Sequence, residues 1–87
     1  MPLVWVPALL QDLSHGQARV SVPGSSVRQV IENLDALYPG FKQRLMDGDQ
    51  LRPNIAVAVD GQVTPRRLRH PLVETSEVHF LPAISGG

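Results

Sequence analysis

The chain has 87 residues, 43% of them apolar, which is enough for one hydrophobic core, so we expect a single domain over residues 1–87. Eight basic and eight acidic side chains give a formal net charge of zero, which disfavours a nucleic-acid partner. The absence of cysteine excludes disulfides, thiolate metal sites and cysteine nucleophiles. We see neither a signal peptide nor a stretch long enough to span a membrane, and we expect a cytoplasmic protein without a membrane partner.

The amino-terminal part predicts two strands. Residues 3–10 are rich in β-branched and aromatic side chains, and their alternation places Val4 and Val6 on one face and Trp5 on the other. Residues 17–22 alternate in the same way after a short polar loop. Two such strands around a short loop are typical of a β-hairpin.

An amphipathic helix is predicted next. Ser26 is followed three residues later by Gln29, which is a capping-box pattern at a helix start. Apolar residues then recur at helical spacing, namely Val27, Val30, Ile31, Leu34, Leu37 and Tyr38. This stripe must be buried, and the sheet is the available partner. Residues 38–40 end the helix, and residues 41–46 are expected to add one short turn.

The carboxy-terminal half predicts further strands. Residues 54–59 alternate as a strand and end at Asp60-Gly61, a strong tight-turn dipeptide. Residues 62–70 are expected to be irregular, with a short strand at their start. Residues 77–82 alternate again, so that Val78 and Phe80 can face the helix.

The last predicted strand runs into a tail at residues 83–87, which ends in two glycines. Glycine has no Cβ and costs much conformational entropy to order, so we expect this tail to be flexible. Its carboxylate, on a sterically bare arm, could be threaded into a narrow channel of another protein. The alternative is a frayed end that happens to finish in glycine.

The predicted order, strand-strand-helix-strand-strand, is a β-grasp (ubiquitin-like) arrangement of the α+β class, with a mixed sheet of four to five strands packed on one main helix. Leu-Pro-Ala-Ile-Ser-Gly-Gly at 81–87 and the hairpin at 54–61 resemble the MoaD/ThiS family of ubiquitin-like sulfur carriers over essentially the whole chain. Val-Trp-Val-Pro at 4–7 and Arg-Leu-Met-Asp at 44–47 are most similar to carriers of the thiocarboxylate-dependent branch of cysteine biosynthesis. Residues 74–77 depart from the Asp-Gly-Asp type of turn that many members carry, which concerns the loop and not the tail.

The resemblance implies a carrier and not an enzyme. An E1-like adenylating enzyme of the MoeB/ThiF type would activate the Gly87 carboxylate, with Ile84, Ser85 and Gly86 threaded into it. ATP and a sulfur donor would be used by that partner, and the carrier itself would bind no cofactor. The resulting thiocarboxylate would pass its sulfur to a downstream enzyme of cysteine, molybdopterin, thiamine or thiolated-tRNA synthesis.

Three other features are candidate sites. Trp5, His79 and Leu81 fall on the outward face of adjacent strands and predict a partner-binding patch, the alternative being surface scatter or a contact between copies. The basic cluster at 66–69 could dock an acidic face of a partner, or could be a solvated loop. The three histidines lack metal-ligand spacing, so no metal site is expected.

Two other functional classes stay open beside the sulfur carrier. A ubiquitin-like modifier would be conjugated through Gly87 to lysines, and self-conjugated chains could grow only on Lys42, the single lysine, or on the amino terminus. A non-catalytic binding module would use the β-grasp surface alone.

Overall fold

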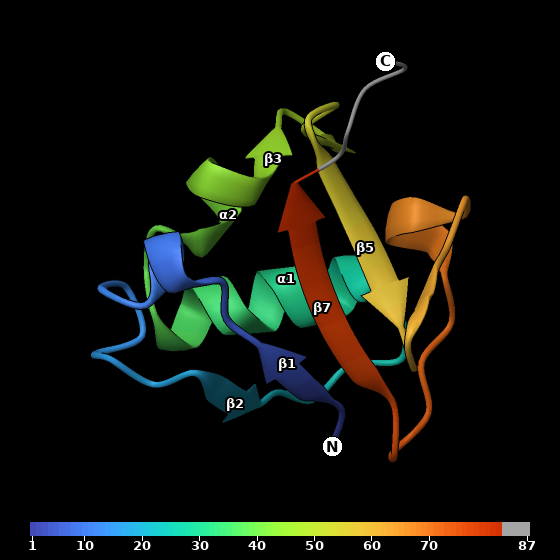
Figure 1. Cartoon of the computed structure of the whole chain (residues 1–87), viewed down its shortest axis with the longest axis horizontal. Helices are drawn as coiled ribbons and strands as arrows, with labels where there is room; N and C mark the ends of the chain where they lie inside the picture. Colours follow the sequence, from blue (N-terminus) through green and yellow to red (C-terminus); the bar gives the residue numbers. More distant parts are fainter. Residues whose placement is uncertain (83–87) are drawn as a thin grey trace.

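The computed structural model describes residues 1–82, so the tail predicted at 83–87 lies outside the described residues. A five-stranded sheet in the order β2-β1-β7-β5-β6 is crossed on one face by the main helix, α1 (Figure 1). The strands are β1 (Leu3–Trp5), β2 (Arg19–Ser21), β5 (Ile55–Val59), β6 (Gln62–Val63) and β7 (Glu77–Pro82). The β1–β7 pair is parallel and the other pairs of this sheet are antiparallel, so the expected mixed sheet is confirmed.

The remaining elements are helices, single turns and a short hairpin. They are η1 (Ala8–Leu10), α1 (Val27–Leu37), α2 (Phe41–Leu45), the hairpin strands β3 (Met46–Asp47) and β4 (Gln50–Leu51), and the single turn η2 (Arg67–Arg69). The short turn predicted for residues 41–46 is confirmed as α2. The hairpin that follows was not predicted, because strands of two residues are too short to show an alternation.

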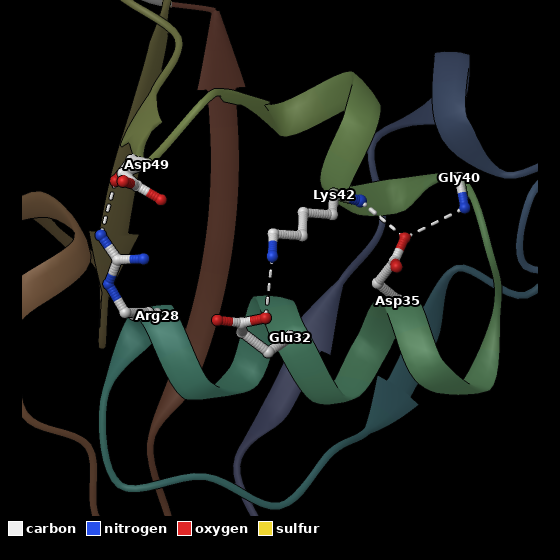
Figure 2. A network of polar contacts seen from close by, with 6 residues as sticks. All are labelled: Arg28, Glu32, Asp35, Gly40, Lys42 and Asp49. Atoms are coloured by element: carbon white, nitrogen blue, oxygen red, sulfur yellow. Dashed lines mark hydrogen bonds and ion pairs between the residues drawn. The ribbon is translucent and has the colours of Figure 1, made fainter.

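Helix α1 begins at the predicted cap. The Oγ of Ser26 accepts a hydrogen bond from the backbone N–H of Gln29 at 3.2 Å. The Gln29 side chain in turn accepts from the N–H of Ser25 at 2.9 Å, one residue earlier than in the usual capping box. The carboxy-terminal end of α1 is fixed as well, because the Oδ1 of Asp35 accepts hydrogen bonds from the backbone amides of Gly40 and Lys42, each at 3.0 Å (Figure 2).

The core lies between the sheet and α1. Side chains on the inner face of the three central strands meet the helix stripe, and those without exposed surface include Val4, Val57 and Val78 from the sheet and Val27, Val30, Ile31 and Leu34 from α1. Phe80 is buried as predicted. Leu37, predicted for the buried stripe, is 56% exposed, because it lies at the edge of the stripe and is the last residue of the helix.

Two predicted strands are shorter than expected. The strand predicted for residues 3–10 ends at Trp5, since Pro7 has no N–H to donate and the chain then coils into η1. The strand predicted for 17–22 covers only Arg19–Ser21. The tight turn after β5 is confirmed, with Asp60 and Gly61 at φ of 52° and 86°, the left-handed values that a two-residue hairpin turn requires.

Arg67 joins η2 to the connection between β4 and β5. Its Nη1 donates to the carbonyl of Ile55 at 3.1 Å, and its Nη2 donates to those of Leu51 and Arg52 at 3.1 and 3.0 Å. The residue itself has a φ of 53°, a left-handed conformation that is uncommon for a side chain of this size. Sequence reasoning treated Arg67 only as one member of a basic cluster and missed this structural role.

We expect Arg67→Lys to lower the free energy of unfolding by about 1 to 3 kcal/mol, because an ammonium keeps the charge but its single nitrogen cannot occupy both positions from which Nη1 and Nη2 donate. Arg66→Lys is the matched control, since Arg66 is exposed, and its effect should stay within about 0.5 kcal/mol. Urea denaturation of both variants measures the difference. Equal midpoints would show that the Arg67 contacts contribute nothing net.

Phe80→Ala should cost about 3 to 5 kcal/mol, because it removes a buried aromatic ring from the sheet–helix interface. Leu81→Ala, the next residue on the opposite face of β7, should cost much less. Thermal or urea unfolding of the pair tests the assignment of faces, which equal losses of stability would contradict.

Candidate functional site

One residue from each strand of the sheet lies in a single row across its outer face. The register of the four strand pairs aligns Arg19, Trp5, His79, Ala58 and Val63 in that order. Helix α1 covers the other face and crosses behind the strands in Figure 1. The main helix therefore does not cover the outer face.

Trp5 is held in this row by contacts with three neighbours. Its ring stacks on that of His79, with centroids 5.3 Å apart and planes 8° from parallel. The guanidinium of Arg19 lies 5.5 Å from the Trp5 ring centroid, in cation–π contact. The indole Nε1 donates to the Oε1 of Glu77 at 3.0 Å. These contacts together hold the Trp5 ring in one orientation on the outer face.

Leu81 lies two residues after His79 along β7 and therefore on the same face. It is 38% exposed and pairs with Ala56 on β5, which has a short side chain. The structure thus places Trp5, His79 and Leu81 on one face as the sequence predicted, and we call these three residues the outer patch.

A groove of about 290 Å³ continues this surface at the end of β7. Leu81 and Pro82 line it from the strand, Leu9 and Leu10 from η1, and Arg44 from α2. Leu9 is 85% exposed because the chain coils into η1 and does not continue β1. Sequence reasoning missed this groove, although the Leu9-Leu10 pair shortly after Pro7 was a signal that could have suggested it.

Within residues 1–82, no three His, Asp or Glu side chains are grouped so that they could hold a metal ion. Each histidine instead has a different local neighbour: His15 meets the ring of Tyr38 edge-on, His70 Nδ1 lies 2.8 Å from Thr64 Oγ1, and His79 stacks on Trp5. In the same part of the chain, no helix has the length and apolar character needed to cross a membrane.

The other predicted site residues, Ile84, Ser85, Gly86 and Gly87, lie outside the described residues. The structure describes the chain up to Pro82, where β7 ends beside the groove and the outer patch. The outer patch, the groove and the point from which residues 83–87 continue thus share one end of the sheet.

Comparison with known proteins assigns the family, because the model of the ThiS family matches residues 4–87. The chain belongs to the ThiS family. The sulfur carrier protein CysO of Mycobacterium tuberculosis is 32% identical over 89 residues, which cover 97% of this chain and 96% of that protein. The expected membership of the sulfur-carrier family is confirmed.

Solved structures confirm the ubiquitin-like β-grasp fold. CysO of M. tuberculosis superimposes with a TM-score of 0.88 and 28% identity in the structural alignment, over 97% of this chain and all of that one. The Amycolatopsis orientalis BexX/CysO complex contains a chain that matches with a TM-score of 0.90 and 25% identity, over 100% of both chains. Small archaeal modifier protein 1 of Methanosarcina acetivorans matches with a TM-score of 0.81 and 25% identity, over 99% of this chain and 95% of that one.

Proposed function

We propose that this protein is a sulfur carrier whose Gly87 carboxylate is adenylated by an E1-like enzyme of the MoeB/ThiF type and converted to a thiocarboxylate. The observation that carries the proposal is that the family match extends through Gly86-Gly87. The curated CysO relative, a sulfur carrier protein, supports it further, because the alignment covers nearly the whole of both chains.

The proposed chemistry explains why a partner enzyme and ATP are needed. A carboxylate is a poor electrophile because its leaving group would be oxide. Attack of the Gly87 carboxylate on the α-phosphorus of ATP releases pyrophosphate and forms an acyl-adenylate. Sulfide or an enzyme persulfide can then displace AMP from the carbonyl carbon. After a persulfide has attacked, a second thiol must attack the enzyme's sulfur in the acyl disulfide, which forms a new disulfide and releases the thiocarboxylate. The carrier's own contribution is to present the reacting carboxylate.

The outer patch is proposed as the surface that docks on the adenylating enzyme. Trp5 is fixed by its three neighbours and Leu81 is partly exposed, so the patch joins a rigid aromatic ring to an apolar anchor. A partner bound here would also reach the groove beside Pro82 and the residues that follow it. That an Amycolatopsis CysO has been solved in a complex with BexX supports a protein partner for this chain as well.

A ubiquitin-like modifier is the second candidate, favoured by the likeness to small archaeal modifier protein 1. Conjugation would join the activated Gly87 carbonyl to a lysine amine. The intact mass of the chain after incubation with an adenylating enzyme, ATP and a sulfur source separates the candidates. A carrier exchanges one oxygen for sulfur, a modifier appears in conjugates, and a plain binding module is unchanged.

Deleting Gly87, or adding one residue after it, should abolish ATP–pyrophosphate exchange with the adenylating enzyme, because the carboxylate would no longer reach the α-phosphate. Gly86→Val should also block exchange, since a β-branched side chain restricts the backbone beside the reacting carbonyl. Gly86→Ala is the milder control. All four variants should keep the parental thermal midpoint, because the core cluster lies between Val4 and Phe80.

Normal exchange by a truncated or extended chain would rule out the carrier and leave the binding module.

Leu81→Asp should weaken binding to the adenylating enzyme by about 1 to 3 kcal/mol, because it places a charge in the middle of a proposed apolar contact. Leu37→Asp is the matched control, since Leu37 is also an exposed leucine but lies on α1, at the other face of the sheet. Isothermal titration measures both affinities, and thermal unfolding checks both folds. Equal losses of affinity would refute a specific role for the outer patch.

A further inference from the structure

A basic groove lies on the helix side of the sheet, away from the outer patch. It is bounded by the first turn of α1, the β3–β4 hairpin and the segment around η2, and has a volume of about 810 Å³. Its charged lining consists of four arginines, Arg28, Arg66, Arg67 and Arg69, and two aspartates, Asp47 and Asp49. Four positive against two negative charges give this groove a local excess of +2 in a chain of zero formal net charge.

The arginines of the groove are not paired with carboxylates within residues 1–82. The ion pairs within residues 1–82 involve the amine of Met1 and the side chain of Lys42, and none involves an arginine. Arg28 and Arg67 direct their guanidinium groups to backbone carbonyl oxygens, which are neutral acceptors (Figure 2 for Arg28). Arg66 and Arg69 are exposed. An anionic group entering the groove would therefore meet the exposed side chains of Arg66 and Arg69 directly. Arg28 and Arg67 add positive charge, although their guanidinium groups already donate to carbonyl oxygens.

The segment that carries these charges is anchored on both sides, which distinguishes it from an ordinary solvated loop. Arg67 binds three carbonyl groups of the β4–β5 connection, and Leu68 is buried in the core. The N–H of Val27 at the start of α1 donates to the carbonyl of His70 at 3.1 Å. The backbone that carries Arg66 and Arg69 is thus already ordered, so binding a partner would cost little backbone conformational entropy here.

The lining favours a protein segment over a polyphosphate. A guanidinium binds a carboxylate through two parallel hydrogen bonds, so arginines suit aspartate and glutamate side chains well. The two aspartates at the hairpin would repel a densely charged nucleic acid, whereas a peptide can place its carboxylates over η2 and uncharged donors near Asp47 and Asp49. Charge complementarity therefore points to an acidic peptide segment.

We propose that the basic groove is a second docking site, which binds an acidic segment of a partner protein while the outer patch remains accessible. The two surfaces lie on opposite sides of the sheet, so a carrier held by its adenylating enzyme could still bind a second protein through the groove. Only this assignment of partners depends on the proposed sulfur-carrier function; the groove itself depends on the charges and anchoring described above.

The test uses the full chain, labelled with ¹⁵N, and the acetylated, amidated hexaglutamate peptide as probe. Addition of the peptide at low salt should shift the backbone amide signals of residues 66–69 and of Arg28, while those of Trp5 and Leu81 stay in place. Binding should weaken as salt is raised, because the groove is open to solvent. An absence of shifts at residues 66–69 would overturn the proposal.

Matched variants separate a site from a general effect of net charge. Arg66→Gln combined with Arg69→Gln should weaken hexaglutamate binding about tenfold. The control, Arg19→Gln combined with Arg44→Gln, removes the same charge outside the groove and should change binding less than about twofold. Thermal midpoints confirm that both proteins are folded. Equal weakening by the two double variants, or tighter binding of a uridine hexanucleotide than of hexaglutamate, would refute an acidic-peptide site.

Independence of the two surfaces is tested with Leu81→Asn, which should bind hexaglutamate as well as the parent protein does. Loss of binding in this variant would show that the surfaces are coupled. ATP–pyrophosphate exchange, measured on the same proteins, keeps the two proposals distinguishable. Normal exchange by a variant that no longer binds hexaglutamate leaves the carrier function intact, and a tail variant without exchange should still bind hexaglutamate.

Discussion

The parallel pairing of β1 with β7 is the constraint on which the rest of the structure depends. It aligns Leu3–Trp5 with residues 77–79, so the first and last strands are neighbours at the centre of the sheet. A parallel pair cannot be closed by a tight turn, so the chain between the two strands must cross over the sheet, and α1 covers the inner face as part of that connection. The same pairing brings Trp5 onto His79 and flanks β7 with a strand on either side, which fixes the direction in which the chain leaves the sheet at Pro82.

Elements with one buried face could be predicted from the sequence, because burial leaves a period of two or 3.6 residues in the pattern. That is why α1, β5 and the inward side chains of β7 were predicted correctly. Arg67 could not be assigned its role in the same way, since the carbonyl groups that it binds lie twelve or more residues away in the chain and no local pattern encodes that contact. The outer patch is intermediate: alternation placed its three residues outward, but the contacts of Trp5 with Arg19 and Glu77 follow from the strand register and from side-chain conformations.

Although the formal net charge is zero, the acidic and basic side chains are not distributed evenly over the surface. The chain has as many acidic as basic side chains, yet within residues 1–82 no arginine forms an ion pair. Several carboxylates instead accept hydrogen bonds from uncharged groups, as Asp35 does from two backbone amides and Glu77 from the indole of Trp5. The arginines are therefore left as local positive potential on both sides of the sheet, Arg19 in the row of the outer patch and four more around the basic groove. A net charge of zero disfavours a broad electrostatic attraction to polyanions, but it does not describe such local surfaces.

The choice of arginine over lysine for these surfaces fits the proposed chemistry of the carboxy terminus. Seven of the eight basic side chains are arginines. A guanidinium stays protonated at any physiological pH and is not a nucleophile, whereas a free amine would attack an acyl-adenylate and form an amide. The one lysine, Lys42, directs its Nζ to the Oε1 of Glu32 at 2.9 Å, across the space between α2 and α1 (Figure 2). A carrier activated at Gly87 would thus offer positive charge to its partners from groups that do not react with the acyl-adenylate. The amines that could react are those of Lys42 and of the amino terminus, and the intact-mass measurement would show their reaction as self-conjugated chains.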